Sequence, residues 1–198
     1  MAHPHPFDLS DAVRPFADDT THASYDPAWA RRDWQALSRV NLLLEEFAGR
    51  FSGKVSPVHH FWHTFDIAPT RFSDRHIDQP PTADPVTREA DAQQLISFGL
   101  WFGDDRLGAP AFSASTAPKP AGLADQPLGP AAAWWDPRDG SHLAVLRYDD
   151  ARASDDPRAT VLDFYESAYQ AGARLAGWDI GHLASPGGIT DPAALVAR

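Results

Sequence analysis

Residues 26–53, DPAWARRDWQALSRVNLLLEEFAGRFSG, carry the pattern that decides the fold of this chain. Asp26-Pro27 places a good N-cap residue before proline, which is favoured at the first helical position. Gly53 is a typical helix stop. Between them, apolar side chains recur at spacings of three and four, as on one stripe of an amphipathic helix: Ala30, Trp34, Leu37, Val40, Leu44, Phe47 and Phe51. The stretch therefore predicts a helix over residues 26–52.

A second stretch near the C-terminus repeats this pattern. Asp156-Pro157 is the N-terminal signal, and the stripe that follows is Val161, Tyr165, Ala168, Gly172 and Leu175. A glycine inside a helix costs about 1 kcal/mol relative to alanine, so we expect close packing at Gly172. The pattern predicts a helix over residues 156–177. Beyond it, Asp191-Pro192 is compatible with one more short helix and also with a flexible tail over 181–198.

The segments between the two helices are rich in aromatic and β-branched residues and predict strands. The ranges are 55–72 with a bend at Pro69, 95–102, 111–116, and a hairpin of 131–135 and 141–146 around Asp-Pro-Arg-Asp-Gly. Together they predict an α+β fold, in which two long amphipathic helices pack on an antiparallel sheet of four to five strands. We expect a single domain over residues 1–198, with 1–25 as an extended lead-in.

Composition excludes several classes of function. The 198 residues carry 27 acidic and 17 basic side chains, a net charge of −10, with the basic residues scattered, so no nucleic-acid partner is expected. No apolar run approaches the roughly 20 residues that span a bilayer. With no cysteine in the chain, disulfides and thiolate chemistry are excluded. No signal peptide is visible, and we expect a cytoplasmic protein without membrane contact.

The segment His59-His60-Phe61-Trp62-His63 is the first candidate for chemistry. On a strand, His59 and His63 would lie about 13 Å apart, too far to share one metal ion. A metal would need ligands from elsewhere, such as His22 or Asp66, and we predict no metal site from this motif alone. Strand alternation places one set of side chains on the core side: His59, Phe61, His63, Phe65 and Ile67. The opposite face mixes an aromatic ring, an acid and a hydroxyl, as small-molecule pockets do: Val58, His60, Trp62, Thr64 and Asp66.

A second polar cluster covers residues 20–26, TTHASYD. Asp26 has a structural role as N-cap, whereas His22, Ser24 and Tyr25 have none that the sequence explains. Serine, histidine and aspartate together invite a hydrolase interpretation, but the chain has no Gly-x-Ser-x-Gly elbow.

Two hypotheses of function follow. The first is a small-molecule-binding protein, with or without enzymatic activity, whose pocket lies near His22, His59 and Trp62. In it, His22 and His59 are acid–base candidates, and the ligand-binding candidates are Tyr25, Trp62 as a stacking floor, Asp66, and Arg71 as an anion clamp. The alternative is a non-catalytic interaction module or a subunit that completes a partner chain. The reaction, ligand and cofactor stay open in both.

Several motifs resemble an uncharacterised bacterial family, domain of unknown function 5996. They are PFADD at 15–19, THASYD at 21–26, GKVSPVH at 53–59, Phe61-Trp62, Phe65-Asp66, TRFS at 70–73, TREA at 87–90, Pro118 with 120–122, and the stretch from Phe164 to Trp178. The resemblance covers roughly residues 12–180 and implies a match to the C-terminal part of the family. Two positions depart from its usual pattern: Gln93-Gln94 replaces a Ser-His pair, and His63 replaces glycine. Members of the family usually carry a further N-terminal portion, and this chain begins where that portion would end. The surface that it would cover should then be apolar and mark an association site, so the resemblance implies a homodimer or a partner chain.

Overall fold

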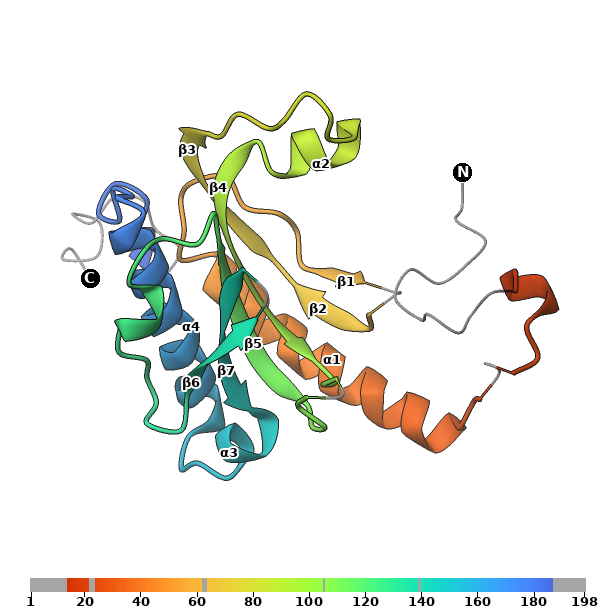
Figure 1. Cartoon of the computed structure of the whole chain (residues 1–198). Helices are drawn as coiled ribbons and strands as arrows, with labels where there is room; N and C mark the ends of the chain where they lie inside the picture. The colour runs from red at the N-terminus through yellow and green to blue at the C-terminus, as the bar shows by residue number, and fades with distance from the viewer. Residues whose placement is uncertain (1–13, 22–23, 62–63, 105, 139, 187–198) are drawn as a thin grey trace.

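A computed structural model describes residues 14–21, 24–61, 64–104, 106–138 and 140–186 of the chain. An antiparallel sheet forms the centre, and the two long predicted helices both pack against it and against each other (Figure 1). The α+β class and the antiparallel sheet are thus confirmed.

The long helices begin where their N-cap signals predicted. Helix α1 is Pro27–Ala48, and the Asp26 carboxylate accepts hydrogen bonds from the Ala28 and Trp29 amides. Helix α4 is Pro157–Leu175, and Asp156 caps it through the Ala159 amide. The described residues add two short α-helices that were not predicted, α2 (Pro85–Ala90) and α3 (Tyr148–Arg152), and the 3₁₀ turns η1 (Phe16–Asp18) and η2 (Leu123–Asp125). Helix α2 begins with the same Asp-Pro signal, at Asp84-Pro85, in a segment for which no helix or strand was predicted.

The sheet has seven strands within the described residues, more than the four to five predicted. They are β1 (His59–Phe61), β2 (Asp66–Ala68), β3 (Thr70–His76), β4 (Gln93–Trp101), β5 (Ala111–Ala117), β6 (Trp134–Arg138) and β7 (Ser141–Arg147). Their order is β1-β2-β4-β5-β7-β6, with β3 also paired to β4, and all pairings are antiparallel. The extra strands arise because the segment predicted as one strand over 55–72 folds back on itself.

The main core lies between the sheet and the two long helices. The Phe47 ring of α1 meets the Phe98 ring of β4 edge-on at 4.8 Å. The fully buried Tyr165 of α4 donates a hydrogen bond of 3.0 Å to the Gly99 carbonyl. Gly172 is buried where a Cβ atom would overlap Thr116 Oγ1. The close packing expected at this glycine is therefore present, and it sets how near α4 lies to β5.

The first turns of α1 extend beyond the sheet (Figure 1). Leu37 is the first buried residue of the helix, so the residues before it are exposed or half-buried. Trp34 was expected in the buried stripe, but its surface is 70% exposed. The prediction was wrong there because the stripe continues past the point where the sheet ends. Within the described residues, no helix has both the length and the apolar character needed to cross a membrane.

Candidate functional site

The segment predicted as a strand over 55–72 is a hairpin. Strand β1 runs outward and β2 returns, with His59 opposite Ala68 and Phe61 opposite Asp66. The reversal is stabilised by a 2.7 Å hydrogen bond from the Phe65 amide to the Phe61 carbonyl. Phe65 itself has a positive φ of 56°. That conformation is uncommon for a residue with a side chain and is typical of tight turns.

The reversal changes which side chains reach the core. Ile67 is buried, as its predicted face requires. His59 is exposed, and so are Phe61 at 39% and Phe65 at 56%. The assignment of these three to the core side was wrong, because β1 is exposed on both faces and a turn interrupts the alternation before Phe65. His63 lies outside the described residues.

Three predicted site residues lie at or near the surface. Tyr25, just before α1, is 78% exposed, and His59 is exposed on β1. Asp66 is half-buried at the start of β2 and accepts a hydrogen bond from the Thr64 hydroxyl across the turn. The structure therefore gives Asp66 a local structural role. Two further predicted residues, His22 and Trp62, lie outside the described residues.

Arg71 is placed differently from these surface residues, because it is buried in the core with only 2% of its surface exposed. Its guanidinium lies among four aromatic rings, with 3.7–5.6 Å between its carbon and the ring centroids: Phe47, Phe51, Phe98 and Tyr169. It donates a hydrogen bond to the Phe47 carbonyl, while its Nε makes none within the described part of the chain. Burial lowers the pKa of Arg71 to about 10. The expected anion clamp is thus inside the protein, because Arg71 lies on the helix-covered face of β3.

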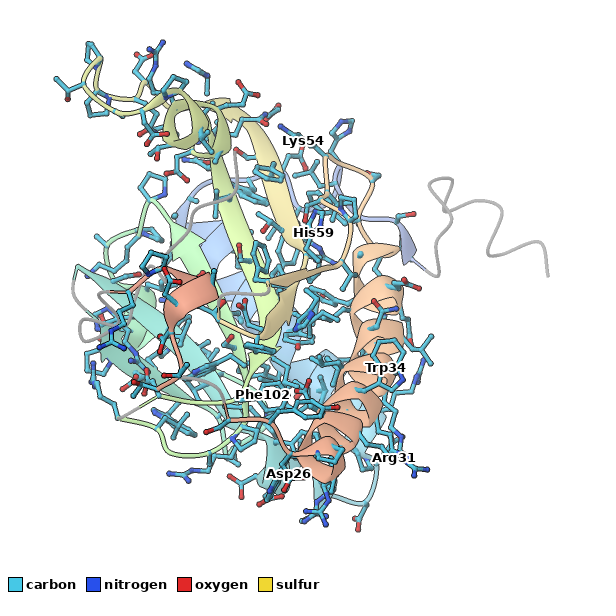
Figure 2. The ribbon with its side chains drawn as sticks, turned by 90° about the vertical axis from the view of Figure 1, so that its right-hand side faces the viewer. Asp26, Arg31, Trp34, Lys54, His59 and Phe102 are labelled. Carbon is cyan, nitrogen blue, oxygen red and sulfur yellow. The ribbon has the colours of Figure 1, made fainter. Side chains whose placement is uncertain are left out.

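Large apolar side chains gather instead at one end of the molecule. Of the eight such residues exposed in the described chain, five belong to the start of α1 or to the β1–β2 hairpin. We name this surface the aromatic end, and its members are Tyr25, Trp29, Trp34, Phe61 and Phe65. Figure 2 shows Trp34 and Arg31 on the outer side of α1, and His59 on the neighbouring segment. The tryptophans near the start of α1 could have indicated this surface from the sequence, but helical periodicity alone assigned Trp34 to the core.

An electrostatic contact connects the two parts of the aromatic end. Asp33 of α1 is half-buried, and this burial raises the pKa of its carboxyl, while the charge of His60 on β1 lowers it in part. The His60 ring also lies edge-on to Phe65 at 5.8 Å. A histidine of the hairpin and a carboxylate of α1 thus influence each other electrostatically. Among the described residues, no three His, Asp or Glu side chains are grouped so that they could hold a metal ion.

Well-formed hollows lie elsewhere on the surface. One of about 700 Å³ is bordered by Glu45, Glu46, Arg50 and Glu166 at the end of α1. Another of about 320 Å³ lies between α1, α3 and α4, over Phe112. Two others, of about 410 Å³ and 220 Å³, are both bordered by Ile77 and Gln79. None of these four is lined by Tyr25, His59, Asp66 or Arg71.

Comparison with protein families shows to which family the chain is related. The model of a family of unknown function, DUF5996, matches residues 1–185. The chain belongs to this family. The resemblance stated from the motifs is confirmed, and the match is wider than the residues 12–180 expected for it. No curated protein and no solved structure matches the chain. Membership in DUF5996 therefore supplies a relationship but no activity.

Proposed function

We propose that this chain is an association module, and that its aromatic end docks a second copy of the same chain. The observation that carries the proposal is that five exposed aromatic residues belong to the start of α1 and to the neighbouring β1–β2 hairpin. Exposed apolar clusters of this kind mark interaction surfaces. The proposal favours the second of the two functional hypotheses.

The energetics support association. A tryptophan side chain buries about 150–250 Å² when it is covered, which corresponds to roughly 4–6 kcal/mol at about 25 cal/mol per Å². Trp29 and Trp34 are 65% and 70% exposed, so most of this free energy is not used in the monomer. The Arg32 guanidinium lies 4.8 Å from the Trp29 ring centroid. Tryptophan and arginine are both among the residues enriched in interface hot spots.

The sheet edge next to this surface supports a second copy as the partner. Within the part of the chain that the structure describes, β1 pairs with β2 alone and lies at one end of the strand order. The opposite edge strand, β6, contains Pro137, which has no amide hydrogen to offer. In addition, the Arg138 side chain of β6 already forms ion pairs with Asp104 and Asp136. Antiparallel pairing of β1 with its copy would be self-complementary, as the contact of a two-fold dimer must be.

Charges at the aromatic end fit the same partner. Arg32 lies beside Asp33 on α1, so both signs of charge occur on one surface. A two-fold axis can then place the basic side chain of one copy against the acidic side chain of the other. Such pairing contributes to orientation and specificity more than to affinity.

Sedimentation velocity tests the proposal. We expect the wild type to sediment as a dimer at micromolar concentration, and Trp29→Glu with Trp34→Glu to sediment as a monomer with unchanged far-UV circular dichroism. Val86→Glu is the matched control, since Val86 is a 76% exposed apolar residue on the separate helix α2. A monomeric wild type, or equal weakening by Val86→Glu, would overturn the proposal.

A further inference from the structure

The groove between α1, α3 and α4 combines an apolar floor with a basic rim. Its floor includes Val40, Phe112 and Val161, each at most 3% exposed. The Tyr148 ring stacks on Phe112 at a centroid distance of 5.9 Å and extends the floor towards α3. The volume of about 320 Å³ equals about ten water molecules at roughly 30 Å³ each. Pockets that enclose small ligands begin at about this size.

Three arginines border this groove: Arg39 of α1, Arg152 of α3 and Arg158 of α4. The chain as a whole has a net charge of −10, whereas the side chains grouped around this apolar floor are positively charged. Anions are therefore attracted here more than to the rest of the surface.

The three guanidinium groups differ in how strongly they are held by carboxylates of the same chain. Arg158 is held by Glu46 of α1 through two hydrogen bonds, one of 3.0 Å from Nε to Oε2 and one from Nη2 to Oε1. These bonds hold the pKa of Glu46 below its usual range, with Arg158 as the largest cause and Arg50 as another. Arg158 is thus a fixed part of the rim.

The other two arginines remain accessible to a ligand. The Arg152–Asp149 pair spans 3.1 Å between side chains that are 69% and 79% exposed. An exposed pair of this kind is weak, so another carboxylate can replace Asp149. Arg39 makes no ion pair among the described residues. One free and one weakly engaged guanidinium at an apolar groove fit a single carboxylate head with an apolar tail.

We propose that this groove binds a small amphipathic carboxylate, of medium-chain aliphatic or aryl-substituted type. The tail lies on Phe112, Tyr148 and Val161, and the carboxylate lies between Arg39 and Arg152. This site is separate from the aromatic end, because none of the residues that line it belongs to the aromatic end.

Calorimetric titration of the full chain with octanoate tests the site, with octanamide as the uncharged probe of the same shape. We expect saturable binding of octanoate, at least tenfold weaker binding of octanamide, and loss of affinity as salt is raised. Arg39→Gln should weaken octanoate about tenfold, in line with loss of one charge-assisted hydrogen bond. Arg31→Gln is the matched control, since it removes an exposed arginine of the same helix that does not line the groove, and it should bind as the wild type does.

A second variant, Ala36→Phe, places a large side chain in the lining and should abolish binding without removing a charge. The proposal is overturned if octanoate does not bind at millimolar concentration. It is also overturned if octanamide binds equally well, or if Arg31→Gln weakens binding as much as Arg39→Gln does. None of these outcomes depends on the oligomeric state, so they are distinguishable from a failure of the proposed association.

Discussion

The guanidinium carbon of Arg71 lies 3.7 Å from the centroid of the Phe47 ring, and the same guanidinium donates a hydrogen bond to the Phe47 carbonyl. One residue of β3 thus binds both the side chain and the backbone of the last turn of α1. This contact attaches the helix to the sheet at its C-terminal end, whereas its N-terminal end extends free. It also explains why a motif residue that looked suited to a ligand is absent from the surface.

Arg71→Ala should lower the free energy of unfolding by about 2–4 kcal/mol, because it leaves a cavity among four rings. Arg71→Met should cost about 1 kcal/mol or less, since it fills the space without burying a charge. The Phe47 carbonyl keeps a 3.2 Å hydrogen bond from the Arg50 amide in both variants. Urea unfolding followed by fluorescence measures the difference. Equal losses for the two variants would show instead that the cation itself stabilises the ring cluster.

Loss of the hydroxyl should change the stability of the protein differently at the two tyrosines of α4, Tyr165 and Tyr169. Tyr165→Phe removes the 3.0 Å bond to the Gly99 carbonyl and should cost about 1–2 kcal/mol. The buried Tyr169 hydroxyl makes no hydrogen bond within the described chain, so Tyr169→Phe should change stability by less than about 0.5 kcal/mol or raise it. The two variants control for each other, since each removes one oxygen from the same helix. A larger loss for Tyr169→Phe would contradict this assignment.

Stability should fall as the pH rises from 10 towards 12. Burial raises the pKa of Tyr169 to about 12 and that of Tyr165 well above its usual value. In the unfolded chain tyrosines ionise near pH 10, so the unfolded state releases protons that the folded state retains, and each tyrosine costs on the order of 1 kcal/mol per pH unit. Arg71 acts in the opposite direction, because its folded pKa of about 10 is below its unfolded value. In the wild type, the loss of stability with rising pH from the two tyrosines should exceed the gain from Arg71. In Tyr169→Phe, the contributions of Tyr165 and Arg71 should nearly cancel. Urea midpoints at successive pH values test this, and a wild-type midpoint that does not fall would contradict it.

Gly172→Ala should destabilise the protein by about 1–3 kcal/mol, even though alanine favours a helix by about 1 kcal/mol. The new methyl group would overlap Thr116 Oγ1 and lie 3.0 Å from Ile96 Cδ1. The double variant Gly172→Ala with Thr116→Ala should recover part of the loss in a thermal unfolding measurement. If Gly172→Ala alone is stabilising, α4 does not lie as close to β5 as the structure places it.

The same cap substitution should act differently at the two long helices. Asp156→Ala should lower the global free energy of unfolding by about 1 kcal/mol, because α4 is buried along most of its length. Asp26→Ala removes an equivalent cap, but from turns that make few tertiary contacts. It should therefore fray the start of α1 with little change in global stability. Hydrogen exchange at the first turn, compared with the urea midpoint, separates the two effects, and equal midpoint shifts would contradict this account.

Local patterns were sufficient for the two long helices and for the class of the fold. The Asp-Pro signals at Asp26 and Asp156 predicted both helix starts, because an N-cap acts within three residues of itself. Alternating strand segments and the hairpin around 136–140 predicted the antiparallel sheet. Family motifs predicted the relationship that the comparison confirmed.

The sequence by itself therefore determined where most elements lie and which class they form, because those signals operate between near neighbours. Tertiary structure alone decided which apolar side chains are covered. Trp34 and Leu37 belong to one helical stripe, yet only Leu37 is buried, because the first turns of α1 extend beyond the sheet (Figure 1). Asp66 and Arg71 are five residues apart, yet the turn before β2 leaves Asp66 near the surface while Arg71 points beneath the helices. Burial depends on contacts between residues far apart in the chain, and no local pattern contains that information.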